Sequence, residues 1–500
     1  MLLSMGENVS GSDTPLPRSR RSVWAPSPSK AADRRRRQGL DWAEIATIGG
    51  IFLLLLMVYL SLASAASTNG VLTGEEASVS FVDVVALPER WQFTHFSTNF
   101  GGHVYFFLTS FLDPSFDLFY GRRAKAFAMA ALPIVVYLTL TRRLHSDRLA
   151  GFCGAVFAGF MPGILAFSWL AIESGLEVVV GGFGLLLATA SSRGWWLSPI
   201  LGGMAISVYG SGIPWYIAIV AVCLIRCVWT PRVDLRTALL RVGLSVVVSI
   251  AIVTFPLVWW AGGSVLTGGG STGSDGAIDR IGSLIGELVN GTGSYYNFIE
   301  QPALGNVFSL TLCLGGLFMI VMRAKSTWPW LLVAGITLLM TMAIGNFPGV
   351  RRSIAILMVL ALGSGLLVDR VIQLVGERRF AVVTVGLLLS ITISISSMAQ
   401  FLSARDALSK SIDASKIDFK FPLTQSGGMP QELDFIASEL GRGRTWADLS
   451  QTWEGERASA MILLLSERGT ISPVAITTSD VENIYRSGSR CETSCTSSSN

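Results

Sequence analysis

Long apolar runs separated by short polar or basic segments follow one another along most of the chain. Roughly 20 helical residues cross a hydrocarbon core of about 30 Å, and several of these runs reach that length. We therefore expect an all-α polytopic membrane protein. The runs predict about eleven membrane-spanning helices, at residues 46–66, 122–141, 148–164, 167–190, 195–210, 212–229, 239–260, 303–322, 328–346, 351–369 and 380–400.

The composition agrees with a membrane protein. Hydrophobic residues make up 51% of the 500 residues and charged residues only 14%, against about 25% charged residues in a typical soluble domain. The mean hydropathy is +0.54. These values exclude a soluble enzyme or a soluble binding domain as a description of the whole chain.

A basic segment precedes the first apolar run. Residues 1–45 are rich in Ser, Pro and Arg and include "RRRR" at 34–37, a composition typical of disorder. Such a run could contact nucleic acid, but a topology anchor beside anionic lipid headgroups is the favoured interpretation. We expect a disordered cytoplasmic N-terminus that contacts membrane lipids, and no nucleic-acid partner.

Basic residues in the predicted loops set the orientation of the chain. Every loop that a cytoplasmic N-terminus places inside the cell carries Arg or Lys, while the short outer turns near 161–167 and 209–213 carry neither. This distribution follows the positive-inside rule. An odd number of spans then places the C-terminal region outside. We expect an integral protein of the bacterial plasma membrane.

Residues 46–400 form the predicted transmembrane domain, with two long extracytoplasmic loops at 67–121 and 261–302. In 401–485, a helical pattern near "PQELDFIASELG" precedes the strand-like segments "SAMILLLS" and "SPVAITT". This pattern predicts a small extracytoplasmic α/β domain. The composition of residues 486–500 is typical of a flexible tail.

Carboxylates occupy two unexpected places near the outer membrane face. Glu75 and Glu76 follow the first span, and Glu173 and Glu177 lie near the outer end of the fourth. Their i, i+4 spacing puts Glu173 and Glu177 on one face of a continuous helix. A carboxylate inside a span costs a few kcal/mol and normally faces a polar cavity or a partner. The alternatives are a solvated loop pair in the first case and a structural pair with an arginine in the second.

Basic residues stand at the same face, against the positive-inside rule. Arg351 and Arg352 open the tenth span, and Arg122, Arg123 and Lys125 open the second. Guanidinium groups suit a phosphate headgroup. For Arg351 and Arg352, the alternative is that the long side chains only extend to the membrane interface. The alternative for the basic residues of the second span is that they pair with the acids.

Acids and arginines at one membrane face together indicate a single extracytoplasmic site. A carboxylate can serve as a general base, and arginines can hold a phosphate leaving group. The combination favours the transfer of a group from a phosphate-linked lipid to an acceptor.

The order of these motifs resembles the GT-C glycosyltransferases, in particular the branch of protein O-mannosyltransferases and lipid A aminoarabinose transferases (glycosyltransferase family 39). The resemblance covers about residues 45–400. It rests on "GEEASVSFVDVVAL", "NFGGHVYFFLTSFL", "GRRAKAFAMAALPIVVYLTLTRRLHSDRLAG", "MPGILAFSWLAIE" and "RRSIAILMVLALGSGLL". Two departures stand out: Glu75 replaces the family's catalytic Asp, and the family's Pro-Pro pair is missing beside His103.

The resemblance implies a GT-C-like fold and an inverting transfer of a sugar from a polyprenyl-phosphate donor to a lipid, glycan or protein hydroxyl. Glu75, with Glu76 beside it, would deprotonate or orient the acceptor, and Glu173 would hold the acceptor or the base. No cofactor or metal is required by this reaction. The three carboxylates could nevertheless hold a divalent cation, because hard cations favour oxygen ligands.

The remaining candidates are assigned to binding by the same resemblance. The lipid phosphate would be bound by arginines at the two basic clusters, Arg351, Arg352, Arg122 and Arg123. His103 and Glu177 would contact substrate.

Two other functions are compatible with the same residues. A transporter also places carboxylates inside spans, although the clustering at one face and the absence of a recognisable sequence repeat favour an interfacial enzyme. A GT-C-like protein without activity, which binds a lipid or a partner, is the third interpretation, because Glu75 departs from the family's pattern.

Overall fold

The regular elements in the described part of the chain are all helices. The structure, a computed structural model, describes residues 41–67, 99–110, 120–190, 194–229, 235–259, 276–290, 302–343, 349–375 and 441–443. The chain divides into two units: residues 1–44, of which only 41–44 are described, and residues 45–500. The packing discussed below belongs to the second unit.

The helices follow the predicted apolar runs. Six are long and apolar enough to cross a membrane, at Trp42–Ser64, Gly121–Arg143, Gly210–Val228, Leu235–Thr254, Ala324–Ala343 and Ile354–Val375. Four shorter apolar helices lie at Arg148–Phe160, Leu176–Thr189, Trp195–Val208 and Val307–Met322. Helices therefore occur at the first ten expected positions, while 380–400 lies outside the described residues. They indicate an integral membrane protein of the all-α class.

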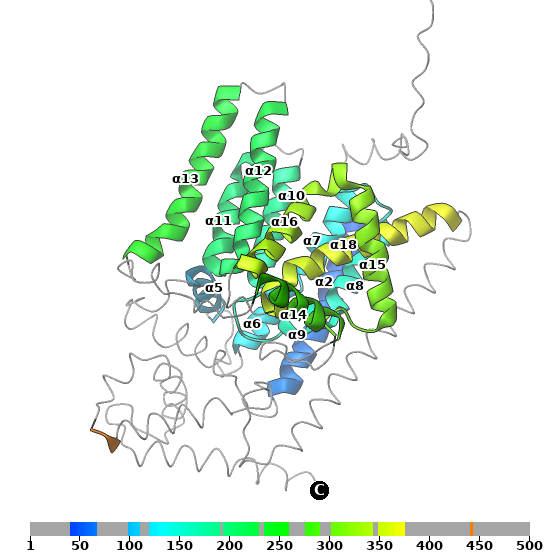
Figure 1. The fold of residues 1–500 in the computed structure, drawn as a ribbon, viewed down its shortest axis with the longest axis horizontal. Helices are drawn as coiled ribbons and strands as arrows, with labels where there is room; N and C mark the ends of the chain where they lie inside the picture. The colour runs from blue at the N-terminus through cyan, green and yellow to red at the C-terminus, as the bar shows by residue number, and fades with distance from the viewer. Residues whose placement is uncertain are drawn as a thin grey trace, which may run out of the picture. The chain divides into compact units, whose positions relative to one another are not determined.

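Individual helices carry the labels of Figure 1. The first group is α2 (Trp42–Ser67), α5 (Phe100–Ser110), α6 (Tyr120–Met129), α7 (Leu132–Leu138), η2 (Thr139–Arg143), α8 (Arg148–Phe160), α9 (Pro162–Phe167) and α10 (Leu176–Thr189). The second group is η3 (Trp195–Leu197), α11 (Ser198–Val208), η4 (Gly210–Gly212), α12 (Ile213–Trp229), α13 (Leu235–Trp259), α14 (Ala277–Val289), α15 (Val307–Met322), α16 (Ala324–Ala343), α17 (Gly349–Arg352) and α18 (Ile354–Val375).

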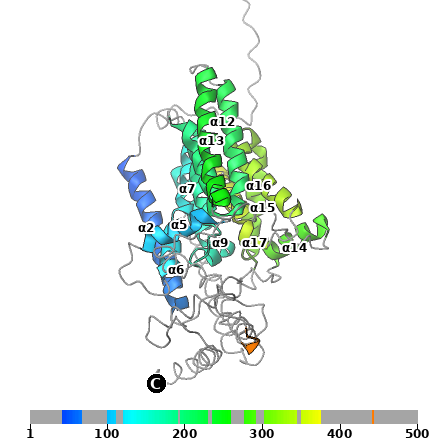
Figure 2. The same ribbon diagram turned by 90° about the vertical axis from the view of Figure 1, so that its left-hand side faces the viewer.

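Helix α18 is a central element of the bundle. It contacts α8, α15 and α16, and its side chains are mostly buried. In contrast, α13 packs mainly on α11 and α12, and Figure 2 shows α12 and α13 running side by side. The outer face of α13 exposes Leu240, Leu244 and Val247, as expected of a helix that faces lipid tails.

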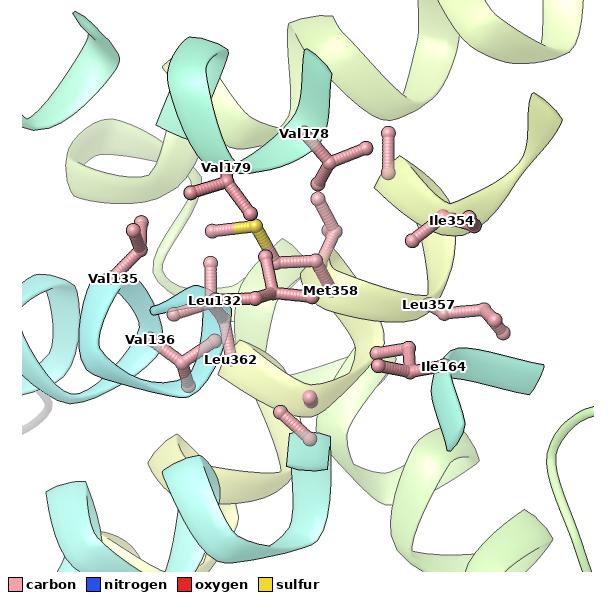
Figure 3. Packing of buried hydrophobic residues seen from close by; sticks show 14 of the residues in the cluster. Leu132, Val135, Val136, Ile164, Val178, Val179, Ile354, Leu357, Met358 and Leu362 are labelled. Atoms are coloured by element: carbon pink, nitrogen blue, oxygen red, sulfur yellow. The ribbon is translucent and has the colours of Figure 1, made fainter. Parts of the chain in front are cut away.

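One apolar core joins the helices that carry the site. Figure 3 shows side chains from α7, α9, α10 and α18 meeting there, among them Leu132, Val135, Val136, Ile164, Val178, Val179, Ile354, Leu357, Met358 and Leu362. Branched and flexible aliphatic side chains fill the space between the helices. This packing fixes the beginnings of α10 and α18, the two helix ends nearest the charged residues described below.

Glycine pairs let α18 approach its neighbours closely. A Cβ atom at Gly316 of α15 would lie 2.4 Å from the backbone nitrogen of Ser364, and one at Gly363 would lie 2.4 Å from the carbonyl oxygen of Gly316. The backbones of α15 and α18 therefore touch, as small residues permit in membrane helices.

The predicted span 167–190 is not one helix. It consists of the end of α9, an irregular segment at 168–175, and α10. Gly175 has a φ angle of 97°, a conformation that glycine adopts at little cost and that interrupts a right-handed helix. The prediction that Glu173 and Glu177 share one face of a continuous helix is therefore wrong: Glu173 lies in the irregular segment, and only Glu177 is helical.

Several predicted regions lie outside the described residues. These are the N-terminal segment up to residue 40, the loop 67–121 apart from its described parts, and the α/β domain at 401–485 apart from 441–443. The predicted tail 486–500 also lies outside them. The loop 261–302 contributes α14 to the described structure.

The close crossing of α15 and α18 predicts the effect of a single methyl group. Gly316→Ala and Gly363→Ala should each destabilise the protein by about 1–3 kcal/mol, because the new Cβ meets backbone that cannot move aside. Thermal unfolding in detergent measures this effect. Gly335→Ala in α16 is the matched control, since a Cβ there meets nothing within 4 Å, and unaltered melting of the two crossing variants would contradict the prediction.

Candidate functional site

A buried lysine supports the irregular segment between α9 and α10. Lys125 of α6 has no exposed surface. Its ammonium group donates to the carbonyl oxygen of Ile172 at 2.7 Å and to that of Ser174. Backbone carbonyls that leave a helix inside an apolar bundle need other partners, and Lys125 provides them on both sides of Glu173.

Glu173 faces an imidazole across this segment. The Oε1 atom of Glu173 lies 3.4 Å from Nε2 of His103, and both side chains are buried. His103 belongs to α5. The neighbouring Gly102 explains how α5 comes so close, because a Cβ at that position would lie 2.4 Å from Cγ of Glu173. The pair can exchange or share a proton, since carboxylates and imidazoles are the usual acid–base groups.

Two further contacts hold α5 in place. A Cβ at Gly101 would lie 2.9 Å from Oγ of Ser207 at the end of α11, so the helix ends touch. On the other side, the hydroxyl of Tyr105 donates to the carbonyl of Ala124 in α6 at 2.6 Å. Burial raises the pKa of the Tyr105 phenol, which keeps this donor protonated. Helix α5 thus bridges α6 and α11 over Glu173.

The two arginines of α17 share an aromatic ring, and one of them, Arg351, also reaches the irregular segment. Arg351 donates from Nε to Oγ of Ser174 at 2.7 Å, and its guanidinium carbon lies 5.4 Å from the centre of the Tyr209 ring. Arg352 lies 5.6 Å from that centre and donates from Nε to the Tyr209 hydroxyl at 3.3 Å. Cation–π contacts of this kind orient guanidinium groups. Tyr209 follows α11, so the α11 end positions both arginines.

Arginine and tryptophan form another contact at this site. The guanidinium carbon of Arg122 in α6 lies 5.3 Å from the centre of the Trp169 ring, and both side chains are buried. Trp169 belongs to the irregular segment, and its indole Nε1 is buried without a hydrogen-bond partner among the described residues. Arg123, the next residue of α6, is half-buried.

Glu177 is bound within the protein. Its Oε1 accepts a hydrogen bond from the Ser211 hydroxyl at 2.7 Å, and its Oε2 accepts one from the backbone N–H of Gly175 at 2.6 Å. The carboxylate stands in the first turn of α10 and has no exposed surface. Negative charge at this end of a helix is favourable, so Glu177 stabilises the start of α10.

The structure thus gathers most of the predicted site residues around one segment. The segment 168–175, which includes Glu173, is contacted by His103, Arg122, Glu177 and Arg351, and Arg352 contacts Tyr209 beside Arg351. Arg123 stands beside Arg122 on α6. Glu75 and Glu76 lie outside the described residues.

Three participants were missed by reasoning from the sequence. Lys125 was expected only to meet lipid phosphate or to pair with the acids, and its bonds to backbone carbonyls were not foreseen, although a lysine among small apolar residues in "AKAFAMAA" was a signal of a buried partner. Ser174 and Tyr209 carried no signal, because a serine and a tyrosine at a span end are ordinary. Their role emerges only from the fold.

The donor atoms do not form a metal site in the described part of the chain. No group of three or more His, Cys, Asp or Glu residues suited to a metal occurs there. A cation held by Glu75, Glu76 and Glu173 involves two residues outside it and stays a prediction. Chemically, the described cluster combines adjacent guanidinium groups, which bind anions, with an imidazole–carboxylate pair, which moves protons.

The approach of α5 to Glu173 predicts a steric effect. Gly102→Ala should displace α5, because the added methyl overlaps the Glu173 side chain. Amide hydrogen exchange in α5 should rise at least about tenfold as its docking weakens. Gly50→Ala in α2, where a Cβ meets nothing within 4 Å, should leave that exchange unaltered. Unchanged protection of α5 in the Gly102 variant would refute this account of its docking.

Comparison with known proteins adds no family to this description. Neither the models of known protein families nor the curated protein sequences match the chain.

Proposed function

We propose that the protein is an integral-membrane glycosyltransferase that moves a sugar from a polyprenyl-phosphate donor to an extracytoplasmic hydroxyl, with inversion. One observation carries the proposal: the buried segment that binds Arg351 through Ser174 also places Glu173 against His103, and Arg352 shares the Tyr209 ring with Arg351. An anion-binding group and a proton-handling group beside each other are what transfer from a phosphate-linked donor requires.

The arginines suit the phosphate of the donor. Arg351 and Arg352 both contact the Tyr209 ring, so their guanidinium groups are held near each other before any ligand binds. When the bond between the sugar and the phosphate breaks, negative charge builds up on the phosphate. Positioned guanidinium groups stabilise that charge with little reorganisation. Arg122, which lies over Trp169 of the irregular segment, and its neighbour Arg123 would add positive charge for the donor phosphate.

The carboxylates suit the acceptor. In a single displacement, the acceptor oxygen forms a bond to the anomeric carbon while the bond to the phosphate oxygen breaks, and polyprenyl phosphate leaves. The proton of the acceptor hydroxyl passes to Glu75 as base, with Glu76 beside it. Glu173, oriented by His103, holds the acceptor. Lipid, glycan and protein hydroxyls all fit this step, which requires no cofactor.

The orientation of the protein follows from the same proposal. Eleven spans with a cytoplasmic N-terminus place α17, the irregular segment and the α/β domain at the outer face of a bacterial plasma membrane. A lipid-linked donor then reaches the arginines from within the bilayer.

Replacement of the proposed base tests the reaction. Glu75→Gln should lower transfer of labelled sugar from polyprenyl phosphate by at least about 100-fold, because general-base catalysis contributes roughly 10²–10⁴. Purified protein in lipid nanodiscs provides the assay, and monodisperse elution with wild-type melting shows that the variant is folded. Full transfer by Glu75→Gln would remove Glu75 from the mechanism.

Replacement of the arginines tests donor binding. Arg351→Gln and Arg352→Gln should each weaken binding of polyprenyl phosphate by about tenfold or more, since a charge-assisted hydrogen bond contributes about 1.5–3 kcal/mol. Arg236→Gln, at an exposed arginine of α13, is the matched control. Equal loss in all three variants would indicate a general charge effect and not a site.

A transporter is the second candidate, favoured by the interrupted helix between α9 and α10 with its buried charges. Solute flux in proteoliposomes without any lipid-linked sugar would support it. Binding of polyprenyl phosphate without either transfer or flux would instead support an inactive lipid-binding or partner-binding protein.

A further inference from the structure

Lys125 bonds the backbone on both sides of Glu173. Its ammonium group donates hydrogen bonds to the carbonyl oxygens of Ile172 and Ser174. The peptide groups that flank Glu173 are therefore held at fixed points, and the direction of the Glu173 side chain is set by the backbone between them. Without this support, an eight-residue irregular segment has many conformations available.

One peptide group joins Lys125 to Glu177. The carbonyl oxygen of Ser174 accepts a hydrogen bond from Lys125, and the N–H of Gly175 in the same peptide group donates one to Glu177. A fully buried ammonium group is costly unless it is paired and hydrogen-bonded. The Glu177 carboxylate is equally buried, and its hydrogen bonds are to Ser211 and Gly175.

We propose that Lys125 is the positioning residue that presents Glu173 to His103 and to the acceptor, and that Glu177 is its balancing charge and not a substrate contact. The part of this inference that concerns activity depends on the proposed glycosyltransferase function. Lys125 itself does not touch substrate, because it is enclosed by the protein.

Charge balance and positioning are separable by mutation. Lys125→Met leaves Glu177 as an uncompensated buried carboxylate, so its melting temperature should fall by at least about 5 °C. Lys125→Met combined with Glu177→Gln removes both charges and should recover most of that loss. The carbonyls of 172 and 174 nevertheless lose their donor in the double variant. Lys125→Arg retains charge and donors, and should restore part of the positioning.

Hydrogen exchange measures positioning without any assay of activity. In the double variant, amides of 168–175 should exchange at least about tenfold faster than in the wild type, while α15 is unaltered. Exchange in α5 should rise as well, to the level produced by Glu173→Gln, because a displaced Glu173 no longer meets His103. Wild-type protection of 168–175 and α5 in the folded double variant would overturn the proposal.

Kinetics then distinguishes positioning from folding. The double variant should lose at least about tenfold in kcat. The KM for the polyprenyl-phosphate donor should change less than about threefold, since Tyr209, which lies outside 168–175, still contacts both arginines. Lys125→Arg should recover part of kcat. A wild-type kcat with faster exchange in 168–175 would overturn the positioning role. If the wild-type protein transfers no sugar, the proposed function fails, while the exchange and melting results still decide whether Lys125 positions Glu173.

Discussion

Peptide groups outside a helix but inside an apolar bundle cannot form hydrogen bonds with water, and this constraint shapes the site. Between α9 and α10 the chain runs irregularly for residues 168–175, and a fully buried ammonium group supplies donors for two of the freed carbonyls. The other polar contacts of the site lie around this lysine. Glu173 meets the imidazole of α5, Ser174 receives Arg351, and Glu177 binds the start of α10. The polar centre of this apolar bundle thus depends on hydrogen bonds that pair the buried backbone carbonyls.

Glycines, which have no side chain, contribute as much to this arrangement as charged residues do. Gly102 brings α5 against Glu173, Gly175 permits the backbone angle that begins α10, and Gly316 and Gly363 bring α15 and α18 into contact. At each of these glycines, an added methyl group would come too close to the backbone or to a neighbouring side chain. The charged groups are therefore held by helices that cannot separate without losing close packing.

The position of the helices was predictable, and the geometry of the site was not. Apolar runs identify helices because length and hydropathy alone decide membrane insertion, and helices occur at the first ten expected positions. In the run "AFSWLAIESGLEVVV" the only local signal of a break is the short polar triplet at 173–175, and it does not reveal that the helix already ends at residue 167. The grouping of Glu173, Arg351 and Arg352 was foreseen from their common membrane face, whereas the contacts with Lys125, Ser174 and Tyr209 depend on tertiary packing that periodicity does not encode.

Tyr209 gives the cluster a mechanical property. Because one ring carries both guanidinium groups, the arginines of α17 form a unit whose position follows the turn between α11 and α12. That turn is itself tight, since a Cβ at Gly212 would lie 2.3 Å from the carbonyl group of Ala205. The end of α11 therefore helps to set where both positive charges lie. The proposed chemistry depends on the distance between the two guanidinium groups and the Glu173 carboxylate. That distance is thus influenced by a helix that carries none of these groups.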